Sequence, residues 1–191
     1  MRKIVFDIET SNVFQDVASN DPAALDLAVC CIYDSETDKY SSYTKETLNE
    51  MWPIFEKADM IIGYNSDHFD IPILNKYYSG DLTKIKSLDL LKEIKNSLGR
   101  RIKLDTVAEA TLGRNKTGHG LESIVWWRNG EKQKVIDYCI EDVRITKDIY
   151  EYALKNGLLK YIDGKDIKDI KLDTTHWEKK DDSAMTFTLP F

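Results

Sequence analysis

The sequence predicts an α/β fold in which helices flank a sheet with both antiparallel and parallel parts. Two observations indicate this. Apolar runs rich in β-branched residues occupy residues 4–8, 25–33 and 59–64 and have the length of strands. Residues 104–112 and 131–155 instead place apolar side chains three or four positions apart, which is the period of a helix with one buried face. Strands and helices in this order are typical of α/β domains.

The N-terminal part supplies three strands and a helix. Residues 4–8 are expected to form a buried strand, because they are β-branched or aromatic apart from one acid. Residues 25–33 predict a second strand, which pairs with residues 39–44 as a hairpin. A helix capped by Thr44 is expected next, with Pro53 kinking or breaking it because proline removes a backbone hydrogen bond.

The middle of the chain continues with a strand and several helices. Residues 59–64 predict a short buried strand, followed by a turn and a helix that begins near residues 67–68. Two further helices are expected at residues 88–98 and 104–112, and a short one at residues 121–127. This arrangement leaves the polar turns at the ends of the strands.

Length and composition favour one domain. The chain has 191 residues, of which 42% are hydrophobic, which is enough for one core. We expect residues 1–173 to form this domain and residues 174–191 to form a polar C-terminal tail with a hydrophobic end. The longest apolar runs are far short of a membrane span, so no membrane association is expected. Three cysteines without zinc-ligand spacing favour a reducing cytoplasm.

The charge is distributed unevenly. The net charge of -6 argues against a protein that coats duplex nucleic acid by bulk attraction. Residues 84–116 nevertheless hold nine Lys or Arg against four acids, and they include the pair Arg100 and Arg101. A solvated face explains such a charge run, and so does a local patch that contacts phosphates.

Two carboxylates interrupt the first strand. Asp7 and Glu9 are two positions apart, so their side chains leave the same face of the strand. Two like charges at an apolar site are costly unless a cation neutralises them. The pattern indicates a divalent-metal site on a central strand. The alternative is a strand end at which both side chains simply reach solvent.

A second acidic stretch follows the strand at residues 59–64. Asp70 lies at the start of the next helix, where the helix dipole favours an acid. Helix capping therefore accounts for Asp70. It does not account for the neighbours Asn65, Phe69 and Pro72.

A third stretch lies in the long helix expected at residues 131–155, which Gly157 closes. Asp142 falls on an otherwise apolar stripe of this helix, and Tyr138 lies one turn earlier on the same face. An acid on a buried stripe is informative, because unpaired buried aspartate is rare. Asp142 is therefore a candidate functional residue.

Together these stretches resemble the tyrosine subclass of the DEDD superfamily of 3′–5′ exonucleases. The second motif looks most like that of the proofreading exonuclease domain of family B DNA polymerases, and residues 104–108 also look like predicted polymerase-elongation-like exonucleases. The histidine subclass would have histidine where this chain has Asp137. The resemblance covers residues 4–157 and implies a ribonuclease H-like fold with a mixed five-stranded sheet flanked by helices. Its three motifs are Asp7-x-Glu9, Asn65-x-x-x-Phe69-Asp70-x-Pro72 and Tyr138-x-x-x-Asp142.

The resemblance also implies roles for the site residues. Four carboxylates would hold two divalent cations, Mg2+ or Mn2+, with Asp7 bridging them. Tyr138 would position the attacking water, since its phenol is a poor base at neutral pH. By the same resemblance, Asn65 and Phe69 would shape the pocket around the terminal nucleotide. The charge of residues 84–116, and not the resemblance, suggests that Arg100 and Arg101 would contact the strand. The full set is Asp7, Glu9, Asp70, Asp142, Tyr138, Asn65, Phe69, Arg100 and Arg101.

The expected function is a metal-dependent exonuclease that releases nucleoside monophosphates from single-stranded DNA 3′ ends. The alternatives are a 3′–5′ RNA exonuclease, a catalytically silent nucleic-acid-binding module, and, less in keeping with Tyr138, a transposase or resolvase on the same fold. The chain is expected to work alone, as an oligomer, or with a separate polymerase as its partner. Residues 186–191 loosely resemble peptides that bind bacterial sliding clamps, with Thr186 in place of the usual glutamine.

Overall fold

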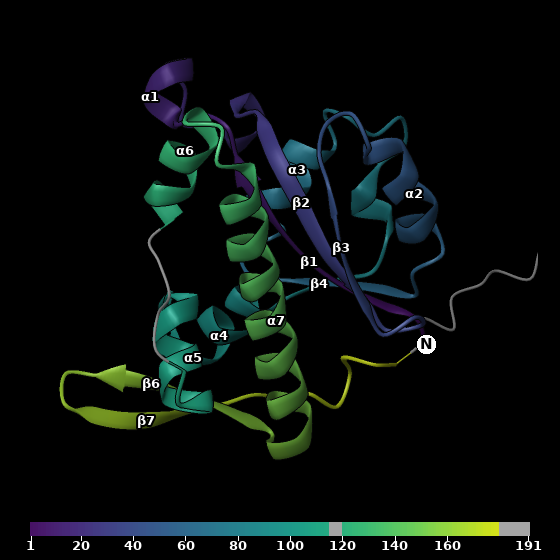
Figure 1. Cartoon of the computed structure of the whole chain (residues 1–191). Coiled ribbons are helices and arrows are strands. Elements are labelled where there is room, and N and C mark those ends of the chain that lie inside the picture. The colour runs from purple at the N-terminus through teal and green to yellow at the C-terminus, as the bar shows by residue number, and fades with distance from the viewer. Residues whose placement is uncertain (115–119, 180–191) are drawn as a thin grey trace, which may run out of the picture.

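A mixed five-stranded sheet forms the centre of the molecule. The computed structural model describes residues 1–114 and 120–179 (Figure 1). The strands lie in the order β3-β2-β1-β4-β5, with β1 antiparallel to β2, β2 antiparallel to β3, and β4 parallel to both β1 and β5. The predicted mixed sheet is therefore confirmed. The strands are β1 (Lys3–Thr10), β2 (Leu27–Asp34), β3 (Lys39–Tyr43), β4 (Met60–Gly63) and β5 (Ser87–Asp89).

Helices cover both faces of this sheet. The long helix α7 crosses one face, and α2 and α3 pack on the other (Figure 1). None of the helices in the described residues is both long and apolar enough to cross a membrane. The helices are α1 (Phe14–Val17), α2 (Leu48–Glu56), α3 (Asp70–Leu74), α4 (Leu90–Leu98), α5 (Leu104–Leu112), α6 (Gly120–Arg128) and α7 (Lys132–Asn156), with 3-10 turns at Pro22–Ala24 and Leu82–Lys84.

Strand β1 divides its side chains between the two faces. Ile4, Phe6 and Ile8 are buried in the cluster beneath α2. Val5 points to the opposite face and is buried in the cluster beneath α7. Because side chains alternate along a strand, Asp7 and Glu9 leave the sheet on the same face as Val5. The two carboxylates are thereby directed toward α7.

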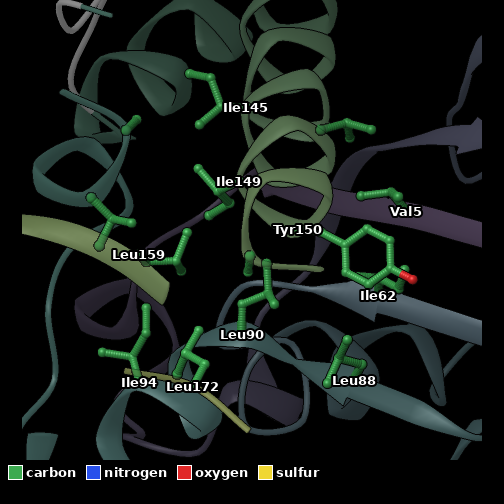
Figure 2. Close-up of a cluster of buried hydrophobic side chains, with 14 of the residues drawn as sticks. Val5, Ile62, Leu88, Leu90, Ile94, Ile145, Ile149, Tyr150, Leu159 and Leu172 are labelled. Atoms are coloured by element: carbon green, nitrogen blue, oxygen red, sulfur yellow. The ribbon is translucent and has the colours of Figure 1, made fainter. Parts of the chain in front are cut away.

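The core on the α7 face extends into the C-terminal part of the chain. Figure 2 shows Val5 and Ile62 from the sheet beside Tyr150 from α7. After α7, the hairpin of β6 (Leu158–Asp163) and β7 (Asp166–Lys171) adds to this core, and the chain then returns to the sheet. Trp177 is 1% exposed and its ring stacks on Tyr150, with centroids 5.9 Å apart. Residues beyond β7 therefore contribute to the main core.

Two of the predicted helices begin later than expected. The helix predicted at residues 88–98 begins at Leu90, because Ser87–Asp89 pairs with β4 as the edge strand β5. The Asp89 carboxylate then accepts a hydrogen bond from the Leu91 N–H at 2.9 Å and caps the helix. The helix predicted from residues 67–68 begins at Asp70, because the Phe69 N–H bonds to the Asn65 carbonyl in a turn.

Helix α2 and the β6–β7 hairpin also differ from the sequence-based prediction. Helix α2 begins at Leu48 rather than near Thr44, and it runs through Pro53 without a break. Four of its apolar side chains are buried, and their packing offsets the single hydrogen bond that the proline removes. The hairpin β6–β7 has no clear sequence signal, since only Ile170 of β7 is buried.

Candidate active site

Strand β1 and helix α7 bring three carboxylates together. Oxygen atoms of Asp7, Glu9 and Asp142 all lie within 4.8 Å of one another. The Cys139 thiol, one turn before Asp142 on the buried side of α7, donates a hydrogen bond to Asp7 Oδ2 at 3.5 Å. Residues far apart in the sequence thus form one acidic cluster. Like charges at this spacing require a cation or protons to be stable.

The turn after β4 positions the second motif. Gly63 is needed here, because a Cβ atom at this residue would lie 2.4 Å from Ser66 Cβ. Asn65 adopts a left-handed conformation with φ of 66°, which asparagine tolerates better than most residues. Buried Asp89 holds the turn by accepting a hydrogen bond from the Asn65 N–H at 2.8 Å and another from the Asp67 N–H at 3.2 Å.

This turn places Asp70 at the beginning of α3, where its side chain is almost completely buried. Asp70 faces the acidic cluster and repels the charges of Asp7 and Glu9. The four acids, Tyr138, Asn65 and Phe69 line one cavity of about 460 Å³. Seven of the nine predicted site residues therefore meet in one place.

The environment of the cluster favours protonated carboxyl groups. Burial, reinforced by repulsion from the neighbouring acids, raises the pKa of Asp7 well above its usual range. Burial likewise raises the pKa of Glu9 to about 8, opposed by a hydrogen bond from Ser123. Burial and repulsion by Asp89 raise the pKa of Asp70 to about 8. Bound divalent cations would reverse this effect, because they stabilise the ionised carboxylates.

The donor set fits hard divalent cations. Every ligand candidate in the cluster is a carboxylate oxygen, which suits Mg2+ or Mn2+. The carboxylates would be neutralised by such ions, which accounts for an otherwise unfavourable concentration of acids. The residues that would hold them are Asp7, Glu9 and Asp142, with Asp70 on the adjoining wall.

Tyr138 lies on the cavity wall one turn before Asp142 and is half-buried. Burial, together with the negative charges of Asp142, Glu9 and Asp7, raises the pKa of its phenol well above the usual value. The hydroxyl therefore keeps its proton at neutral pH. Tyr138 is suited to donating or orienting a hydrogen bond and is not suited to acting as a base.

The two predicted arginines are not placed alike. The Arg101 guanidinium donates a hydrogen bond to Asn65 Oδ1, so Arg101 lies at the edge of the cavity. Arg100 instead pairs with Asp163 at 3.0 Å and lies over the Tyr161 ring of the β6–β7 hairpin. Arg101, and not Arg100, thus contacts a residue that lines the acidic cavity.

Several residues of the site lie outside the three motifs. Ser123 Oγ donates a hydrogen bond to Glu9 Oε2 at 2.5 Å, and Trp126 packs its ring edge-to-face with Tyr138. Asp89 supports the turn that carries Asn65. The sequence signal for these roles is weak, because a serine or tryptophan in a short helix has many ordinary explanations. Their contacts depend on how α6 docks against β1 and α7.

A cluster of carboxylates beside the central strand of such a mixed sheet is suited to metal-dependent phosphodiester chemistry. A profile described as RNase_H superfamily matches residues 4–154, and the chain belongs to this superfamily. No sequence among the curated proteins matches. Membership and cluster together support a nuclease.

One solved structure extends the comparison. The chain is similar to the family B DNA polymerase from the hyperthermophilic archaeon Pyrobaculum calidifontis, with a TM-score of 0.62 and 20% sequence identity. The match covers 81% of this chain and 24% of the polymerase, so the chain spans about a quarter of that protein's length. The ribonuclease H-like fold and the resemblance to part of a family B polymerase, both predicted from the three motifs, are confirmed.

Proposed function

We propose that this protein is a metal-dependent 3′–5′ exonuclease that releases nucleoside monophosphates from the 3′ ends of single-stranded DNA. The observation that carries the proposal is that one cavity joins Asp7, Glu9, Asp70 and Asp142 with Tyr138. A module that only bound nucleic acid would have no need for four acids in one cavity. Their retention favours a catalyst over a silent binding module.

Asp7, Glu9, Asp70 and Asp142 are the groups that would hold two divalent cations. When bound, such cations would lower the pKa of the attacking water and stabilise charge on the phosphate. The role of the carboxylates is to fix the ligand geometry and to remain ionised once the cations compensate their repulsion. Asp70 is almost completely buried and the other three acids are partly buried, which limits competing solvent.

Tyr138 contributes through its protonated hydroxyl, which orients the attacking water by a hydrogen bond while the phenol keeps its proton. Asn65 and Phe69 line the same cavity and would hold the terminal nucleotide. Phe69 also packs edge-to-face with Phe14, which limits the motion of its ring. A base stacked on Phe69 would place the last phosphodiester near the acids.

The 3′ polarity and the preference for single-stranded DNA come from the family resemblance. A cavity of this size admits one chain end more readily than a duplex, which supports a single-stranded substrate. A separate DNA polymerase is a proposed partner, because the structural relative is a polymerase. The proposed sliding-clamp motif at residues 186–191 lies outside the described residues.

The test is digestion of single-stranded DNA and RNA oligonucleotides of the same sequence, labelled at the 5′ end or at the 3′ end. Reactions contain Mg2+, Mn2+ or EDTA. We expect the 3′ label to be released first as a nucleoside monophosphate, only with metal present. Asp7→Ala and Asp142→Ala should abolish cleavage without loss of folding, because they remove mutually repelling charges.

Three outcomes would contradict the proposal. Full activity in EDTA would exclude the two-metal mechanism, and cleavage by Asp7→Ala would exclude the assigned ligand. Cutting of closed circular strands would exclude an exonuclease. Faster digestion of the RNA strand would replace DNA with RNA as the substrate class, which is the second candidate function.

A further inference from the structure

Helix α6 contacts the candidate active site through two residues one turn apart. Ser123 is completely buried, and its Oγ atom donates a hydrogen bond to Glu9 Oε2 at 2.5 Å. Trp126 and Tyr138 pack with ring centroids 6.1 Å apart and an interplanar angle of 73°. Residues three apart on a helix share a face, so one side of α6 reaches both a carboxylate and the tyrosine.

The hydrogen bond from Ser123 restricts the conformations of the Glu9 side chain. Glu9 lies where the pairing of β1 with β2 becomes irregular, between Glu9 and Thr10. Its long side chain has several rotamers, and repulsion from Asp7 and Asp142 favours those that lead away from the cluster. A fixed donor on one carboxylate oxygen restricts these rotations. Such hydrogen bonds to ligating carboxylates orient them for metal binding.

Trp126 acts on Tyr138 by packing. Tyr138 is half-buried, so its ring has solvent on part of its surface and requires a contact to fix its orientation. The edge-to-face arrangement with Trp126 is a favourable geometry for two aromatic rings. Rotation of the Tyr138 side chain about its Cα–Cβ bond, which would move the hydroxyl, would break this contact. The position of the hydroxyl is thereby tied to α6.

Helix α6 is itself held firmly enough to position other groups. The Glu131 N–H donates to the Trp126 carbonyl at 2.8 Å, which closes the short link from α6 to α7. At the same end, Arg128 pairs with Asp16 of α1 at 2.5 Å. The C-terminal end of α6 is therefore connected to α7 and to α1, both of which contribute residues to the cavity.

We propose that α6 is a positioning element of the site, in which Ser123 orients the Glu9 carboxylate for metal binding and Trp126 orients the Tyr138 hydroxyl. The inference rests on the proposed function. It assigns to this helix two roles that none of the three motifs contains. It also predicts that the two residues affect different steps, since Glu9 binds metal and Tyr138 does not.

The first experiment measures Mn2+ binding to the full chain without nucleic acid, by electron paramagnetic resonance. Ser123→Ala should weaken Mn2+ binding about 10–100-fold, as expected when a partner of a metal ligand is removed. Ser123→Cys has a side chain of similar size that donates a weaker hydrogen bond. Its Mn2+ affinity should lie between those of the wild type and Ser123→Ala. In the Glu9→Ala background, which has no side-chain oxygen for Ser123 to orient, Ser123→Ala should have little further effect, which a merely structural role of the serine would not produce.

The control is Ser97→Ala, which removes a serine hydroxyl that donates to the Lys171 carbonyl at 2.6 Å, away from the cavity. Its Mn2+ affinity should equal that of the wild type. Unchanged affinity in Ser123→Ala, with clear binding in the wild type, would refute the role of the serine alone. Absence of Mn2+ binding in the wild type would refute both this inference and the proposed function.

The second experiment measures kcat and Mn2+ affinity of Trp126→Leu. We expect kcat to fall about tenfold with unchanged affinity, because a displaced hydroxyl affects the chemical step. The loss should disappear in the Tyr138→Phe background, which has no hydroxyl to position. Trp127→Leu is the matched control, because Trp127 lies under the Lys132 ammonium instead. Equal losses in both tryptophan variants, or a loss that persists with Tyr138→Phe, would refute the role of Trp126.

Discussion

Replacing Glu9 by glutamine should stabilise the metal-free protein, and increasingly so as the pH rises. Burial raises the pKa of Glu9 from its ordinary 4.5 to about 8. Below pH 4.5 the side chain is protonated in both the folded and the unfolded chain, so the substitution has little effect. Between pH 4.5 and 8 the unfolded chain loses this proton and the folded protein retains it. The wild type therefore loses stability over this range, and the glutamine variant does not.

The size of the effect follows from the pKa shift. At about 1.4 kcal/mol per pH unit, the full shift corresponds to about 5 kcal/mol at pH 8. Partial exposure of Glu9 and the coupling among the four acids reduce this, and we expect about 2–3 kcal/mol. For a chain of this length, this is a rise in Tm of about 5–10 °C. Glutamine can still accept the hydrogen bond from Ser123, so packing should change little.

The assay is thermal unfolding in EDTA at several values between pH 4.5 and 8.5. Glu50→Gln is the control, because Glu50 is an exposed glutamate on α2. With Mn2+ added at pH 8, the order should reverse, because the wild type gains more binding energy than the variant. A difference in Tm between Glu9→Gln and the wild type that is the same at every pH would refute the electrostatic reasoning.

Three further predictions follow from contacts described above. Tyr138→Phe should reduce single-turnover cleavage about 10–100-fold and leave Mn2+ affinity unchanged, and an unchanged rate would remove Tyr138 from the mechanism. Trp177→Ala should lower the free energy of unfolding in urea by about 3–5 kcal/mol, because it empties a buried site stacked on Tyr150. A loss below 1 kcal/mol would show that the C-terminal segment does not stabilise the domain. Arg101→Ala should raise the KM for single-stranded DNA about tenfold, as expected for the loss of a charged contact. Arg100→Ala should raise it much less, and equal effects would contradict the different placements of the two arginines.

The strands and long helices were predictable because their buried faces require apolar residues at regular spacings in the sequence. The run at residues 4–8 and the stripe along α7 are examples, and both elements appear where expected. Strand β5 was not predictable, because it has only three residues and is followed at once by the first apolar residues of α4. The β6–β7 hairpin was missed for a related reason. Most of β7 is exposed, so its alternation of lysine, aspartate and isoleucine does not mark a buried face.

The meeting of the motif residues in one cavity was predictable, whereas their supporting contacts were not. Asp7 and Asp142 could be anticipated because acids within apolar patterns are rare, whereas Asp70 was identified through the resemblance of its motif. The hydrogen bond from Ser123 to Glu9 joins residues 114 positions apart and depends on the docking angle of a short helix. The separation of Arg100 from Arg101 depends on the path of a loop after α4. No local sequence pattern encodes this hydrogen bond or the different placement of the two arginines.

The division of β1 between two faces limits how its sequence can change. Single substitutions at Ile4 or Phe6 would cost packing energy on one face only. Insertion or deletion of one residue would exchange the faces along the strand, since register and side-chain direction are coupled. Phe6 and Ile8 would then enter the acidic cavity, and Asp7 and Glu9 would be forced beneath α2 among apolar side chains. A change in the length of this strand should therefore disrupt the core and the acidic cavity in one step.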